Sequence, residues 1–110
     1  MMNELEFRDR ADQAIGNLKK SLETAADRYG FEVDSNQGAL TIEFEEPPAR
    51  FVVSPNSPVR QIWVSARVKS FKLDWDYARA EFVLPDGRSL RQLMADVTGE
   101  QLGEAVVLAD

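Results

Sequence analysis

Cysteine and histidine are both absent from the 110 residues of the chain. Their absence excludes disulfide bonds, thiolate nucleophiles, imidazole bases, zinc sites built on these ligands, haem ligation and cysteine-held clusters. A metal ion bound here would therefore be held by oxygen ligands. Long apolar runs are absent too, since none approaches the roughly 20 residues of a membrane-spanning helix. Residues 1–10 are charged where a secretory signal would be apolar, so we expect a cytoplasmic protein with no membrane partner.

Positive charge is scarce, because 19 acidic residues face 13 basic ones and leave a net charge of −6 at pH 7. This balance disfavours attraction to nucleic acid, and we expect no nucleic-acid partner. The excess is local. Residues 1–46 hold 11 acidic and 5 basic side chains, whereas the two signs balance over residues 47–110. The acidic surface is therefore predicted to lie in the first part of the chain.

A long amphipathic helix is predicted over residues 3–29, where apolar side chains recur at spacings of three and four. Asn3 followed by Glu6 is typical of a capping box at the start, and Gly30 is a natural stop. A second helix is predicted to begin after Ser89, a good N-cap residue, and to end just before Gly99.

Between the two helices the apolar period changes to two, which predicts strands. Pro47 and Pro48 are expected to end the second strand, and residues 54–58 are expected to form a proline-rich turn. The strand-like runs cover residues 31–34, 40–45, 51–53, 59–66, 68–75 and 78–84. The order of helix, strands and helix predicts an α+β fold over residues 1–110 as one domain. We expect a two-layer sandwich, with both helices on one face of an antiparallel sheet of about five to six strands.

Trp63 is the most informative side chain of the predicted open sheet face. In its strand Ile62, Val64 and Ala66 share one parity, and Trp63 shares the other with polar neighbours. A tryptophan on the solvent side of a sheet is typical of the anchor residues of protein interfaces. The alternative is that neighbouring arginine or lysine side chains cover it.

Carboxylates form the second pattern. Glu23 and Asp27 lie four residues apart on one helix face. Glu32 with Asp34, and Glu43 with Glu45, share the outward parity of two adjacent strands. Oxygen ligands without histidine or cysteine suit iron, manganese, calcium or magnesium, held weakly. A merely solvated acidic face fits the same pattern. No residue set indicates a catalytic site, and none is expected.

Several segments together resemble the frataxin family. They are residues 38–42 (GALTI), 58–65 (PVRQIWVS), 71–75 (FKLDW) and 86–90 (DGRSL), of which the Gln-x-Trp strand is the most specific. Residues 6–7 and 11–13 are similar to the bacterial branch of the family. The resemblance implies two helices on an antiparallel sheet. It also implies an iron-binding regulator of iron-sulfur cluster assembly that docks on a cysteine desulfurase and its scaffold protein, as a monomer that could oligomerise with iron.

The resemblance assigns contact roles to Gln61 and Trp63, and it places Lys72 where basic residues are common. Ser54 stands where the family usually has an asparagine. For iron, the matching acidic residues are Glu23, Asp27, Glu32 and Asp34.

Two lysines depart from the family pattern, because Lys19 and Lys20 occupy positions that are acidic in typical bacterial members. Positive charges beside carboxylates oppose cation binding, so weaker iron binding than the family norm is expected. Two alternatives stay open: an iron-storing or ferroxidase protein, and a small acidic secretion chaperone.

Overall fold

The predicted N-terminal helix forms as α1, Glu4–Tyr29, in the computed structural model, which describes residues 2–108. The side chain of Asn3 accepts a hydrogen bond of 2.8 Å from the Glu6 amide, and Gly30 ends the helix in the left-handed conformation at φ 80°. Its buried stripe contains Phe7, Ile15 and Leu22, among others, and covers the sheet. Over residues 2–108, neither helix combines the length and the apolar character that crossing a membrane requires.

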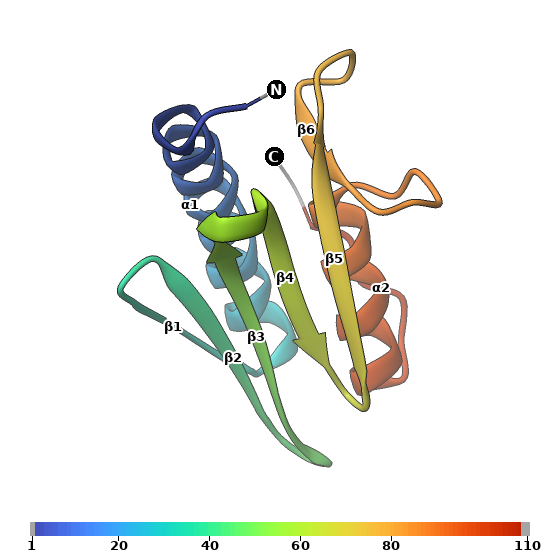
Figure 1. The fold of residues 1–110 in the computed structure, drawn as a ribbon. Helices are drawn as coiled ribbons and strands as arrows, with labels where there is room; N and C mark the ends of the chain where they lie inside the picture. Colours follow the sequence, from blue (N-terminus) through green and yellow to red (C-terminus); the bar gives the residue numbers. More distant parts are fainter. Residues whose placement is uncertain (1, 109–110) are drawn as a thin grey trace.

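Six strands form one antiparallel sheet in which neighbours in the sequence are neighbours in space (Figure 1). They are β1 Glu32–Asn36, β2 Ala39–Glu45, β3 Pro48–Asn56, β4 Gln61–Ala66, β5 Lys69–Asp76 and β6 Glu81–Val83. The second helix, α2, runs from Leu90 to Leu102 on the same side of the sheet as α1. The predicted two-layer α+β architecture is thereby confirmed, with β1 and β6 as the two edges.

The core lies between the helices and the inner face of the sheet. Ile62, Val64 and Ala66 are at most 1% exposed, which confirms the alternation predicted for β4. Phe7 of α1 packs edge-on against Phe82 of β6, with ring centroids 5.9 Å apart. Because every second residue of the central strands points into this core, the intervening side chains form an open outer face.

The proline-rich segment differs from the prediction. Pro48 begins β3 instead of ending β2, and β3 continues to Asn56, with Pro55 opposite Ile62. The fixed φ of proline is compatible with an extended chain. Because proline has no amide hydrogen, the ladder lacks one hydrogen-bond donor at that position. The reversal is made by a 3-10 turn, Ser57–Val59, and by Arg60 in the left-handed region at φ 55°. The next strand therefore starts at Gln61 and not at residue 59.

The end of α2 also differs from the prediction, because the helix passes through Gly99 and stops at Gly103, where φ is 72°. A Cβ added to Gly99 would lie 2.9 Å from the backbone oxygen of Glu104. The chain after Gly103 thus folds back onto α2 at this position, and it buries Val106 and Leu108. The lack of a side chain at Gly99 allows the returning chain to come this close to α2, and the helix itself ends one turn later.

Candidate functional site: the open sheet face and the acidic edge

Trp63 stands at the centre of the open face. It lies in β4 between Ser54 of β3 and Lys72 of β5, which are its partners in the two ladders. Its side chain is 38% exposed, although the residues on either side of it, Ile62 and Val64, are buried. The period of two in β4 therefore places the indole on the side of the sheet that no helix covers.

Two neighbours contact the indole, and a third bonds to one of them. Its Nε1 donates a hydrogen bond of 2.9 Å to Oε1 of Gln61, and Nε2 of Gln61 donates one of 3.1 Å to Oδ1 of Asp74. The ammonium nitrogen of Lys72 lies 4.9 Å from the centroid of the Trp63 ring, a cation–π contact. We call Gln61, Trp63, Lys72 and Asp74 the Trp63 cluster.

The structure brings together the three contact residues named from the sequence, Gln61, Trp63 and Lys72, and adds a fourth. Asp74 is paired with Gln61 across the β4–β5 ladder and orients its amide. The sequence contained a partial signal, because Asp74 shares the outward parity of Lys72. The strand register needed to place it opposite Gln61 could not be read from the sequence.

The four predicted iron ligands are spread over two elements. Glu23 and Asp27 lie in the second half of α1, and Glu32 and Asp34 lie on β1, which is the edge strand beside that helix. All four are exposed. We call them the acidic edge. Exposed carboxylates at one edge attract cations through their summed field, and water completes their coordination of hard ions.

More carboxylates come from β2. Glu32 is directly opposite Glu43 in the ladder, and Glu32, Glu43 and Glu45 line a hollow of about 330 Å³ at this edge. Like charges opposite one another in a sheet repel, which a bound cation would relieve. Within residues 2–108, however, no three acidic side chains are close enough together to form a ready-made metal site. The structure thus shows an acidic surface and no preassembled coordination sphere.

Lys19 and Lys20 precede Glu23 and Asp27, the two residues that α1 contributes to the acidic edge. Lys19 lines a hollow between the helix and the β1–β2 turn, together with Ser35 and Gly38. The two lysines are three and four residues before Glu23, the spacing at which helical side chains are neighbours. They therefore lower the negative field at one end of the acidic edge.

The fold agrees with comparisons to known proteins. The family model of the frataxin-like domain matches residues 1–104. The chain belongs to the frataxin-like family. Membership of this family gives no support to the alternative of a small acidic secretion chaperone.

Within that family the chain is similar to bacterial proteins named iron-sulfur cluster assembly protein CyaY. The protein of Azotobacter vinelandii is 33% identical, covering 86% of this chain and 88% of its own. Those of Pseudomonas aeruginosa and Dechloromonas aromatica are 34% and 32% identical, and each covers at least 95% of both chains. The solved frataxin of Psychromonas ingrahamii, 22% identical, superposes with a TM-score of 0.77, covers 99% of this chain and 100% of its own, and supports the fold.

Proposed function

We propose that the chain is a regulatory adaptor of iron-sulfur cluster assembly in the cytoplasm. In this role it docks as a monomer on a cysteine desulfurase and its scaffold protein through the Trp63 cluster, and it binds iron weakly at the acidic edge. The proposal rests on membership of the frataxin-like family together with the exposed, hydrogen-bonded Trp63 on the open face. The relatives named for cluster assembly align over nearly the whole chain.

The Trp63 cluster has the physical character of a protein-binding site. Large aromatic side chains at the centre of an interface contribute most of its binding energy, and a polar rim fixes the orientation. Here the indole supplies apolar area, and Gln61, Lys72 and Asp74 supply polar groups around it. The cluster lies on the outer face of β4 and β5, and such a sheet surface suits a macromolecule better than a small ligand, which prefers a concave pocket.

For iron, the proposal assigns the ligands to Glu23, Asp27, Glu32 and Asp34. Carboxylate oxygens are ligands that hard cations accept, and the exposure of all four favours exchange with water. Their distribution over a helix and an edge strand favours weak and labile binding. Such binding suits a protein that presents iron and does not store it.

Binding to a purified desulfurase–scaffold complex tests the docking. Trp63→Ala is expected to weaken binding at least tenfold, because it removes the apolar anchor. Tyr77→Ala is the matched control, since Tyr77 is also an exposed aromatic residue, at 57%, but lies in the β5–β6 turn outside the Trp63 cluster. The measurement is made with and without Fe(II) at two salt concentrations. Equal affinity of the wild type and Trp63→Ala would contradict docking through this face.

The two lysines beside the acidic edge allow a separate prediction for iron. Lys19→Glu is expected to raise the affinity for Fe(II) several-fold, because it replaces a repulsive charge with an attractive one next to Glu23 on the helix. Anaerobic isothermal titration calorimetry measures this affinity. Lys69→Glu is the control: it makes the same charge change on β5, four strands away from β1. An equal gain in Fe(II) affinity in both variants would show that net charge alone determines iron binding. That result would contradict the assignment of iron to the acidic edge.

A further inference from the structure

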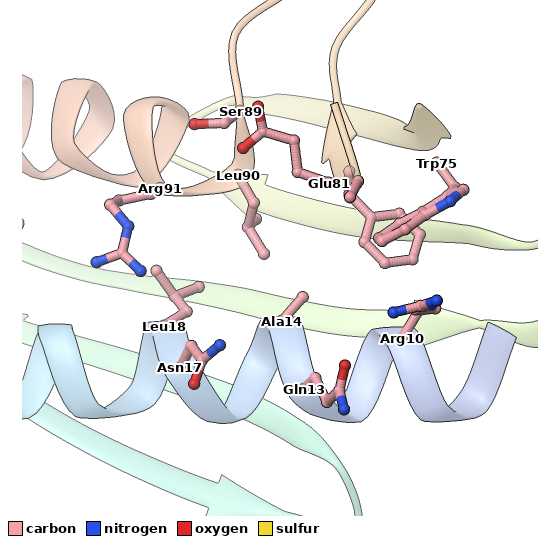
Figure 2. A pocket seen from close by; sticks show the side chains of 12 residues that line it. Arg10, Gln13, Ala14, Asn17, Leu18, Trp75, Glu81, Ser89, Leu90 and Arg91 are labelled. Carbon is pink, nitrogen blue, oxygen red and sulfur yellow. The ribbon is translucent and has the colours of Figure 1, made fainter. Parts of the chain in front are cut away.

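A cleft of about 400 Å³ lies between α1 and the segment that connects the end of β5 to the start of α2 (Figure 2). No residue of the Trp63 cluster or of the acidic edge lines it. The cleft is therefore separate from both surfaces discussed above, and an inference about it does not depend on the proposed function.

The lining of the cleft combines an apolar floor with a polar rim. Ala14 and Leu18 of α1 face Leu90 at the start of α2, and Figure 2 shows these three side chains between the two helices. Arg10 and Gln13 stand on the α1 rim, nearer the start of that helix. The lining is divided about equally between apolar and polar side chains, and the volume is within the range of sites for small organic ligands.

Trp75 forms one end of the cleft with its indole ring. The indole Nε1 is buried, with no acceptor for it within residues 2–108, and as it has almost no accessible surface it is closed to the cleft. The guanidinium of Arg10 lies over the same ring, 5.2 Å from its centroid. An exposed cation and an aromatic ring thus lie together at this end.

The charges around the cleft favour an anion. Within residues 2–108 Arg10 makes no ion pair. Arg91, on the opposite wall, donates to Oγ of Ser21 at 2.6 Å and adds a second positive charge. Glu81 also lines the cleft, but its carboxylate is paired with Arg79 and is directed towards Ser89 in Figure 2, away from Arg10.

We propose that this cleft binds a small organic carboxylate. Its carboxylate accepts hydrogen bonds from the Arg10 guanidinium, which favours such groups by its planar donors and lies over the Trp75 ring. Its apolar body lies on Ala14 and Leu90. The two ends of the ligand thus match the two parts of the lining, and neither part alone would select this chemistry.

Nuclear magnetic resonance of the full chain tests the proposal directly. The chain has two tryptophans, so a ¹H–¹⁵N spectrum contains two indole signals, of which that of Trp63 is an internal reference. In a benzoate titration at constant ionic strength, the Trp75 indole signal is expected to shift saturably with a dissociation constant on the order of 1 mM. The Trp63 signal is expected to stay in place. Acetate and inorganic phosphate, which lack an apolar body, are expected to bind at least several-fold more weakly.

Two arginine variants identify the site. Arg10→Gln is expected to weaken benzoate binding about tenfold, and an unchanged Trp63 signal shows that the variant is folded. Arg8→Gln removes the same charge from the same helix, at a residue paired with Glu4 outside the cleft, and is expected to bind like the wild type. Equal shifts of both indole signals, an Arg10→Gln variant that binds like the wild type, or phosphate binding as tight as that of benzoate would overturn the proposal.

Discussion

Ile62→Ala is expected to lower the free energy of unfolding by about 2–5 kcal/mol, the range found for large aliphatic side chains removed from a closed core. Ile62 is 0% exposed and lies in β4, in the middle of the sheet, where the surrounding strands leave little freedom to fill the cavity. Urea denaturation followed by circular dichroism measures the change.

Its neighbour Trp63 is the matched comparison. Trp63→Ala is expected to cost no more than about 1–2 kcal/mol, because the indole is 38% exposed and its hydrogen bond and cation–π contact both face water. The two variants truncate adjacent residues of one strand, so the backbone context is the same. Equal losses would show that Trp63 acts mainly as a packing residue of the sheet and weaken the case for a contact surface.

Gly99→Ala is expected to destabilise the protein by about 1–3 kcal/mol, although alanine is the better helix former. The added Cβ would lie 2.9 Å from the Glu104 backbone oxygen, so the chain after α2 must move. That movement would loosen the packing of Val106 and Leu108, which are buried. Thermal unfolding measures the effect.

Gly16→Ala is the control for helix propensity. Gly16 lies within α1, and nothing lies within 4 Å of a Cβ added there. This variant is expected to gain up to about 1 kcal/mol, through propensity and the smaller entropy of the unfolded chain. If Gly99→Ala stabilises to the same degree, the close approach of the chain to α2 does not matter for stability.

Periodicity and capping residues predicted most of the fold. The prediction for α1 is correct at both ends, because the Asn3 side chain caps the start of the helix and Gly30 ends it. The inner parity of β4 followed from Ile62, Val64 and Ala66 alone, since a strand with one buried face must alternate. These features are local, and a sequence contains the local information that determines them.

The missed features depend on contacts between distant segments. Pro55 looks like a turn residue, but in the folded chain it lies opposite Ile62 in the sheet. Gly99 looks like a helix end, and its actual role is set by Glu104, which returns across the helix. The same limit applies to Asp74, whose link to Gln61 depends on the β4–β5 register. The cleft near Trp75 combines residues from α1, β5 and α2, so no single segment predicts it.

The candidate site was predicted unevenly for the same reason. Gln61 and Trp63 lie two residues apart on one strand, so their proximity was visible in the sequence. The acidic residues, Glu43 included, were identifiable by type and parity, whereas the position of Glu43 directly opposite Glu32 depends on the ladder register. The assignment of iron to the acidic edge stays a prediction that the lysine variants test.

The edges of the sheet bear on aggregation. Exposed edge strands are templates on which another chain can add, and short or charged edges resist this. The edge strand β1 carries Glu32 and Asp34, and β6, at the other edge, has three residues. Neither edge offers a long uncharged strand to a second chain. The protein therefore leaves one sheet face open to solvent without exposing edges that would recruit unfolded neighbours during synthesis or stress.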